Sequence, residues 1–296
     1  MPKHHTFGGR HTDDKLVRLA AYMKAFTTAL KNQRFELVYI DAFAGSGERA
    51  GTRPALPLFD KNSTGEIVTV PGSALRALET TPPFDCLVLI EQNRGRFQSL
   101  EELAAKYPQH NVRLHRGDAN GVVRRLCAEI PWHRSNRQAK GVRGVLFLDP
   151  YGMEVEWATI EAVAETEALD AWIFFPLSGL YRNAPLDRLK ISEDKHHRIT
   201  AVLGTDDWEA SWYNSQSYQT DLFGDETTSI RTVDVDAIEE YVRKRLATVF
   251  KGAVLKPRRI YNDRGAPLAS LFFAVSNPHP KAVEVATRIA GSILKR

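Results

Sequence analysis

Short, continuously apolar runs alternate with helical segments along much of this chain, and this alternation limits its fold more than any other feature. Strands are expected at residues 35–43, 86–90, 112–115, 144–149 and 170–176, and several of them are continuous apolar runs. Strands without polar alternation are buried on both faces, which is typical of a parallel sheet covered by helices. We therefore predict an α/β fold with a mostly parallel, Rossmann-like sheet.

A capped amphipathic helix is predicted before the first apolar run. Thr12, followed by Asp13 and Asp14, has the pattern of a helix N-cap with acidic residues in the first turn. Apolar residues then recur at a helical period as far as Leu30. Residues 49–70 are rich in proline, glycine and polar side chains, so we expect a loop inserted after the first strand.

The pattern changes between about residues 178 and 230, where we expect an inserted subdomain of short helices and loops. An antiparallel strand pair is predicted at 253–261 and 268–276, because Asn-Asp-Arg-Gly between them is a hairpin-turn sequence. Helices are expected on either side of this pair, at 235–250 and 281–294. The sequence thus predicts a single domain over residues 1–296 that carries one mainly helical insertion.

The composition excludes several classes of protein. With 43% hydrophobic and 26% charged residues, the chain is neither disordered nor fibrous. A net charge of +4 and a pI near 9.0 permit a nucleic-acid partner without requiring one. Cys86 and Cys127 lie in apolar surroundings and form no CxxC pair, so we expect buried thiols and no metal site. The first residues lack a signal peptide's apolar core, and no apolar run would span a bilayer, which favours a cytoplasmic protein without membrane contact.

Polar residues and glycines follow successive apolar runs, where open parallel sheets bind their ligands. Gly45 and Gly47 end the first run, Glu91 ends the second, and Asp118 follows the third. A strand-end carboxylate in the place of Glu91 accepts hydrogen bonds from ribose hydroxyls, and Asp118 is placed to accept one from an adenine amino group. Each feature alone is equally compatible with a tight turn or an exposed acid, but their order favours an adenosyl cofactor. The glycines are not in a Gly-x-Gly-x-x-Gly pattern, which disfavours NAD.

The fourth strand is followed by Asp149, Pro150 and Tyr151. A carboxylate and a proline carbonyl can both accept from an amino donor while the aromatic ring stacks on a planar group. Methyltransferases that act on exocyclic amino groups use a related Asp/Asn-Pro-Pro-Tyr turn, although here one proline is missing and Gly152 follows the tyrosine. The competing interpretation, of equal weight, is purely structural: Asp149 caps the next helix, and the ring of Tyr151 packs against other residues of the chain.

Three other groups of residues are weaker candidates. His196 and His197 lack further ligands at metal spacing, which favours a solvated helix face. The basic run at 256–259 could contact phosphate, but a solvated strand edge is the more common role. Trp208 and Trp212 have helical spacing and are expected to be core residues rather than a platform for bases.

These motifs together resemble the three-Cys-motif partner proteins of bacteria. The resemblance rests on the sequences His-Thr at 11–12, Tyr-Ile-Asp-Ala-Phe-Ala-Gly-Ser-Gly at 39–47, Gly-Ser-Ala-Leu at 72–75, Gly-Asp-Ala-Asn at 117–120 and Phe-Leu-Asp-Pro-Tyr-Gly-Met at 147–153. It extends from about residue 11 onward and is loosest in the middle segment. One departure is Ser46, where many relatives are expected to have proline.

The resemblance implies a Rossmann-type methyltransferase that works with a protein partner, which looks like a radical S-adenosylmethionine protein carrying a three-cysteine motif. It implies S-adenosylmethionine as the cofactor and a class I methyltransferase-type sheet, but supplies no substrate. The residues that it and the strand ends assign to the cofactor are Asp41, Ala42, Phe43, Gly45, Gly47, Glu91, Gln92, Asp118 and Ala119.

Three functional hypotheses follow from the sequence. In the first, the chain methylates an amino nitrogen, with a nucleic-acid base as one candidate acceptor, and Asp149, Pro150 and Tyr151 are the catalytic residues. In the second, the fold binds the cofactor without catalysis and docks the three-cysteine partner. In the third, which rests on the basic pI, the chain is an accessory protein in nucleic-acid processing.

Overall fold

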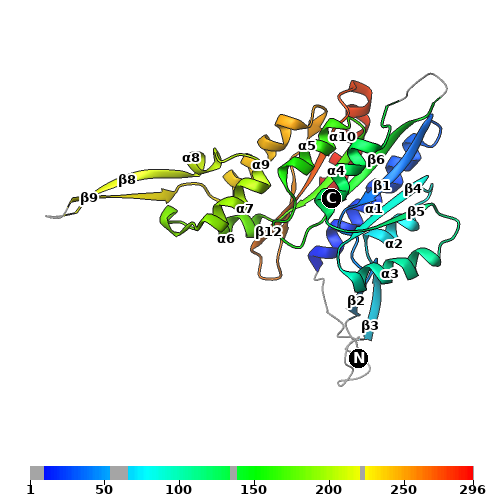
Figure 1. Cartoon of the computed structure of the whole chain (residues 1–296), viewed down its shortest axis with the longest axis horizontal. Helices are drawn as coiled ribbons and strands as arrows, with labels where there is room; N and C mark the ends of the chain where they lie inside the picture. The colour runs from blue at the N-terminus through cyan, green and yellow to red at the C-terminus, as the bar shows by residue number, and fades with distance from the viewer. Residues whose placement is uncertain (1–9, 54–65, 134–138, 221–223, 296) are drawn as a thin grey trace. The chain divides into compact units, whose positions relative to one another are not determined.

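The computed structural model of the chain describes residues 10–53, 66–133, 139–220 and 224–295 (Figure 1). The chain divides into two compact units. The first contains the residues up to Val122 together with Pro131–Phe147, and the second contains Val123–Ile130 and Leu148–Lys295. Among the helices described, none is long and apolar enough to cross a membrane.

Parallel strands form the centre of the first unit. Strand β1 pairs with β4 on one side and with β6 on the other, and β5 pairs with the far edge of β4. Every residue of β4 is buried, as its unbroken apolar sequence predicts. The strands are β1 (Phe35–Asp41), β4 (Cys86–Glu91), β5 (Val112–Arg116) and β6 (Gly141–Leu148). All four were predicted from the sequence, although β5 alternates apolar and polar residues.

The helices that begin in this unit are α1 (Arg10–Leu30), α2 (Ser73–Leu78), α3 (Arg94–Ala105) and α4 (Ala119–Glu129), although α4 belongs to the second unit from Val123 onward. Helix α1 buries Leu19 and Met23 completely, so its apolar face belongs to the core. The predicted N-cap at Thr12 is wrong, because α1 already begins at Arg10. Helix α3 begins at a genuine cap, since Asn93 Oδ1 accepts from the backbone N–H groups of Gly95 and Arg96.

A β-hairpin replaces part of the predicted loop at residues 49–70. Strands β2 (Glu48–Arg53) and β3 (Glu66–Pro71) pair antiparallel, while residues 54–65 lie outside the described part of the chain. A loop was predicted because this stretch is rich in proline and glycine, but its β-branched residues were overlooked. The run Ile67-Val68-Thr69-Val70 is β-branched, and such residues suit an extended backbone.

Antiparallel strands form the sheet of the second unit. Strand β12 (Pro267–Val275) pairs with β7 (Leu169–Phe175) on one side, and with β10 (Ala253–Val254) and β11 (Arg258–Tyr261) on the other. This confirms the predicted hairpin, although its first strand is divided. Pro257 lies in the gap between β10 and β11, where its missing N–H costs no ladder hydrogen bond.

Outside the inserted segment, this unit contains the helices α5 (Trp157–Glu165), α9 (Val235–Val249) and α10 (Pro280–Lys295). That segment begins with α6 (Leu177–Asn183), the short 3-10 helix η1 (Arg188–Lys190), α7 (Glu193–Leu203) and α8 (Trp208–Trp212). It ends in a hairpin of β8 (Tyr213–Thr220) and β9 (Gly224–Arg231), which was not predicted (Figure 1). The hairpin's polar sequence has no apolar alternation that would reveal its strands. Trp208 and Trp212 are buried, as expected.

The strand order of the main sheet is β10-β12-β7-β6-β1-β4-β5. The strands around β1 are parallel, and β12 runs antiparallel to β7 near the other end. This is the order found in the Rossmann-like sheet of class I methyltransferases. The predicted fold class is therefore confirmed.

Candidate functional site

The predicted cofactor residues lie at three neighbouring strand ends in the first unit. Asp41 is the last residue of β1, Glu91 is the last residue of β4, and Asp118 follows β5. Backbone hydrogen bonds join these ends: Ala44 N donates to Ile90 O at 2.9 Å, and Gly117 N donates to Glu91 O at 3.3 Å. The structure thus brings the glycine loop, Glu91 and Asp118 together along one edge, as the parallel arrangement requires.

The glycines of the loop have different structural roles. Gly45 has φ +64° and Gly47 has φ +77°, in the left-handed region that favours glycine. A Cβ at Gly47 would press against Leu100 and Leu103 of α3, so Gly47 permits close helix packing. A Cβ at Gly45 would have no atom of the described residues within 4 Å. Gly45 is therefore the place where the loop backbone faces open space.

The buried carboxylate of Asp41 stabilises the start of the glycine loop. Its side chain is completely buried and accepts hydrogen bonds from Tyr39 Oη at 3.1 Å and from Phe43 N at 3.3 Å. Ala42 is also buried, and its N–H donates to Phe147 O at 3.1 Å, while Phe43 is half-buried. These contacts fix the turn at the end of β1.

Glu91 is a buried carboxylate held in one orientation. It is 5% exposed, and its Oε1 accepts from Asn93 N at 2.7 Å and lies 3.1 Å from Arg96 Nη2. Within the described part of the chain, no hydrogen bond reaches its Oε2. The second oxygen is thus left to accept from a ligand. Gln92, the next residue, is exposed.

Asp118 lies at the start of α4. Its Oδ2 accepts from Gly121 N at 2.8 Å, which is an N-capping interaction. Asp118 is exposed, and Ala119 behind it is buried. The cap fixes the orientation of a carboxylate that remains accessible at the strand ends.

The Asp149-Pro150-Tyr151 loop lies in the second unit, directly after β6. Asp149 is half-buried, Pro150 is buried, and Tyr151 is 64% exposed. Helix α5 begins at Trp157 with Glu156 at its N-cap, so Asp149 does not cap it. Both parts of the competing interpretation are wrong, because Tyr151 does not pack into the core either.

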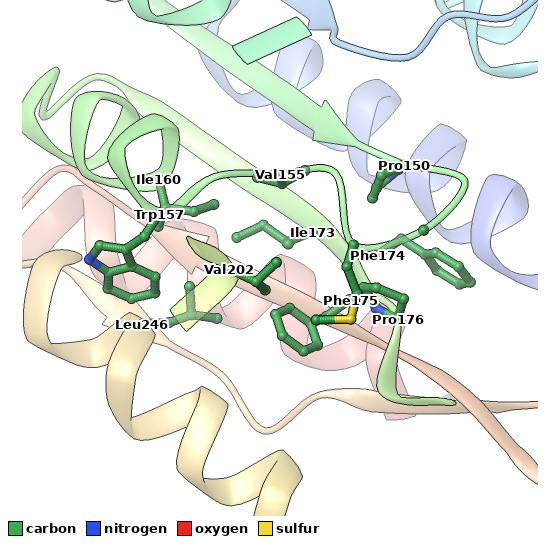
Figure 2. Close-up of a pocket in the computed structure, with 12 residues that line it drawn as sticks. Pro150, Val155, Trp157, Ile160, Ile173, Phe174, Phe175, Pro176, Val202 and Leu246 are labelled. Atoms are coloured by element: carbon green, nitrogen blue, oxygen red, sulfur yellow. The ribbon is translucent and has the colours of Figure 1, made fainter. Parts of the chain in front are cut away.

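A small apolar cavity lies beside Pro150 (Figure 2). Its volume is about 20 Å³, roughly the room that one water molecule occupies. The lining comes from the loop after β6, from α5 and β7, and from α7 and α9, and it includes Trp157, Ile173 and Leu246. No cofactor fits here. Pro150 therefore contributes packing, whereas Asp149 is half-buried and Tyr151 is exposed.

Several solved structures align with the chain at low similarity. Protein LPL1258 from Legionella pneumophila is 15% identical, with a TM-score of 0.42 and coverage of 82% of this chain and 93% of that one. An S-adenosylmethionine-dependent methyltransferase from Clostridium acetobutylicum is 12% identical, with a TM-score of 0.35 and coverage of 90% and 96%. The TYW2 protein of M. jannaschii, in complex with AdoMet, is 11% identical, with a TM-score of 0.29 and coverage of 76% and 78%.

No family model matches the sequence, and no curated protein matches it. The site is therefore interpreted from its own residues and from the strand order.

The weaker candidates have structural partners. His196 is half-buried, with its ring centroid 5.2 Å from that of Trp208 and Nε2 3.0 Å from Glu209 Oε2, so the predicted solvated face holds only for His197. Among the described residues, no group of three or more His, Cys, Asp or Glu side chains has the arrangement of a metal site.

Arg259, in the basic run, is half-buried, and carboxylates engage its guanidinium group. It donates to Glu239 from Nε at 3.1 Å and from Nη2 at 2.7 Å, and it pairs with Asp236. Ser270 Oγ donates to the same Glu239 at 2.9 Å. Arg259 thus ties β11 to α9 and β12.

Sequence reasoning missed the residues that hold the candidate site in place. Asn93 and Arg96 fix Glu91, and Tyr39 fixes Asp41. Asn93 carried a usable signal, because asparagine just before a helical period is a typical N-cap. Tyr39 carried none, since its apolar neighbours suggest only a core residue.

Proposed function

We propose that the chain is an S-adenosylmethionine-dependent methyltransferase that acts on an amino nitrogen. The observation that supports this most strongly is the pair of backbone hydrogen bonds that join the glycine loop, Glu91 and Asp118 into one edge. A class I sheet places its adenosyl cofactor at this edge.

The residues at the edge match the groups of this cofactor. Open space at Gly45 allows the backbone to approach a ligand closely. The Oε2 atom of Glu91 can accept from ribose hydroxyls, and the Asp118 carboxylate can accept from an adenine amino group. The cofactor supplies a methyl group on a positively charged sulfur.

Asp149, Pro150 and Tyr151 are proposed to orient the acceptor. Asp149 and the carbonyl of Pro150 would accept from the acceptor's N–H groups, and the exposed Tyr151 ring would stack on its planar part. Asp149 or water would take up the proton that the acceptor nitrogen releases when it gains the methyl group. Holding the amine in line with the methyl group would supply most of the rate enhancement.

Calorimetry with S-adenosylmethionine tests the cofactor site. The wild-type chain should bind, and Glu91→Gln should bind about tenfold more weakly, because charge-assisted hydrogen bonds are about twice as strong as neutral ones. Glu102→Gln, on the exposed side of α3, is the matched control and should bind normally. A folded wild-type chain that does not bind the cofactor would refute the proposal.

A second measurement tests the acceptor site. Asp149→Ala should abolish transfer of labelled methyl groups to cellular nucleic acid while leaving cofactor affinity unchanged. Full turnover by this variant would remove Asp149 from the mechanism. Binding without turnover on nucleic acid would redirect the search to small-molecule or peptide acceptors.

The alternative is a non-catalytic docking partner of the three-cysteine protein. The sequence resemblance favours such a partner whether or not the chain is an enzyme. Co-purification of the chain with a radical S-adenosylmethionine protein, with no methyl transfer by the chain, would support the alternative.

A further inference from the structure

One lysine of α1 is almost completely buried. Lys15 is 8% exposed, whereas lysine side chains are rarely buried away from an anionic group. The residues that follow it at intervals of four, Leu19, Met23 and Thr27, are completely buried. Residues at this spacing share one face of a helix. Lys15 therefore belongs to the face of α1 that packs into the core of the first unit.

Helix α1 places Lys15 level with the carboxyl end of β1. The helix and the strand are joined by residues 31–34, contact each other, and run in opposite directions (Figure 1). Lys15 precedes Leu30, the end of the helix, by fifteen residues, which corresponds to about 22 Å of helix. Asp41 follows Phe35 by six residues, which corresponds to about 20 Å of strand. Lys15 and Asp41 thus lie at the same end of this pair of elements.

The direction of helical side chains brings the lysine ammonium group closer to the strand ends. In an α-helix the Cα–Cβ bonds tilt toward the N-terminus, and long side chains continue in that direction. The N-terminal end of α1 lies at the carboxyl end of β1, because the two elements are antiparallel. Helix α1 also contacts α2, which begins just after Gly72, and Gly72 N donates to Gly47 O at 2.9 Å. The stem of Lys15 therefore leads from the core toward the glycine loop.

The proposed cofactor would bring a negative charge to this place. The sheet has the order β1-β4-β5, and the residues proposed for adenine and ribose, Asp118 and Glu91, follow β5 and β4. The cofactor would then extend along the edge from β5 to β1, with its methionine part at the glycine loop. That part carries a carboxylate, and the candidate ligand-binding side chains at this edge are themselves acidic. A carboxylate removed from water needs a cation or hydrogen-bond donors beside it.

We propose that Lys15 binds the carboxylate of the methionine part of S-adenosylmethionine. The inference rests on the proposed function and adds a cofactor-binding residue from α1, outside the strand ends. An ammonium group has three donors, so hydrogen bonds of Lys15 within the chain are compatible with a ligand contact. Arg18, the next cation on this helix, is engaged by Asp14, with Nη2 donating to Oδ1 at 2.8 Å and Nε donating to Oδ2 at 3.1 Å.

Calorimetry with two ligands tests the proposal. One is S-adenosylmethionine, and the other is its decarboxylated form, which keeps the adenosine, the sulfonium and the amine but lacks the carboxylate. The wild-type chain should bind S-adenosylmethionine at least about tenfold more tightly, because only this ligand accepts a charge-assisted hydrogen bond from Lys15. Lys15→Met, which keeps an unbranched apolar stem in the core, should lose this preference and bind the decarboxylated ligand as the wild type does.

Lys24→Met, at an exposed position of the same helix, is the matched control and should keep the wild-type preference. Circular dichroism shows whether each variant folds, and Lys15→Gln is the second variant if Lys15→Met does not. The comparison of the two ligands on the wild-type chain needs no variant. Equal affinity of the wild type for both ligands would overturn the proposal. An unchanged preference in a folded Lys15 variant, or an equal loss of affinity for both ligands, would overturn it as well.

The two proposals fail differently. A wild-type chain that binds both ligands with equal affinity would keep the cofactor site and remove only the role of Lys15. A folded wild-type chain that binds neither ligand would refute the proposed function, and the role of Lys15 with it.

Discussion

A methyl group added at Gly45 offers the sharpest test of whether the glycine loop contacts the cofactor. Gly45 has φ +64°, where an alanine is strained by about 1–2 kcal/mol. Its new Cβ would meet no atom within 4 Å in the part of the chain that the structure describes, so no steric cost is added there. Gly45→Ala should therefore lower the free energy of unfolding by only about 1–2 kcal/mol. If the cofactor lies against Gly45, its affinity should fall at least about tenfold, which is about 1.4 kcal/mol.

Gly265 provides a matched control in the β11–β12 turn. Its φ is +75°, and a Cβ there would also have no atom within 4 Å. Gly265→Ala should thus lose a similar amount of stability in urea unfolding without any change in calorimetric affinity for S-adenosylmethionine. The reasoning is refuted if Gly45→Ala binds the cofactor as wild type does, or if both variants lose affinity equally.

The remaining predictions concern ionisable groups. Arg259→Met should lower the free energy of unfolding by about 3–5 kcal/mol, because it leaves the Glu239 carboxylate buried without its main partner; adding Glu239→Gln should restore part of the loss in the same urea titration. Burial raises the pKa of Tyr213 from 10.0 to about 12. The wild type should therefore lose stability relative to Tyr213→Phe as pH rises from 10 toward 12, because the unfolded chain ionises first; parallel pH profiles would contradict this. Burial also raises the pKa of the Cys127 thiol to about 12, so it should react slowly with Ellman's reagent at pH 8, where roughly one thiol in ten thousand is ionised.

The sequence predicted the parallel strands well because their burial is visible in the residues themselves. All residues of β4 and β7 are buried, and most of each strand is an unbroken apolar run, at residues 86–90 in β4 and 171–175 in β7. The hairpin turn at residues 262–265 was also predictable, since Gly265 adopts the positive φ that such a turn requires.

Strands with largely polar sequences were not predictable in this way. Strands β8 and β9 pair along their whole length, yet their sequences are largely polar. A sequence without alternation of apolar and polar residues does not distinguish such strands from a loop. Strand β2 (Glu48–Arg53) was likewise not predictable from its own sequence. Only its partner strand β3 is rich in β-branched residues.

The candidate site was predicted at the level of strand ends but not of side-chain contacts. Asp41 and Glu91 were both expected to contact the cofactor, and both are buried. Tyr39 and Phe43 N occupy the carboxylate of Asp41, whereas Arg96 and Asn93 N occupy one oxygen of Glu91. Which atoms remain for a ligand depends on these tertiary contacts, and a strand-end position alone does not reveal them.

The hydrogen bond from Gly72 N to Gly47 O, at 2.9 Å, closes the base of the β2–β3 hairpin. A Cβ at Gly72 would lie 2.6 Å from Gly47 O, so the two backbones touch where the hairpin begins and ends. Chain segments that leave and return at nearly the same point can be lengthened or shortened at little entropic cost. The hairpin is thus an insertion in the connection between β1 and α2. Replacing it with another sequence should leave the conformation of the glycine loop unchanged.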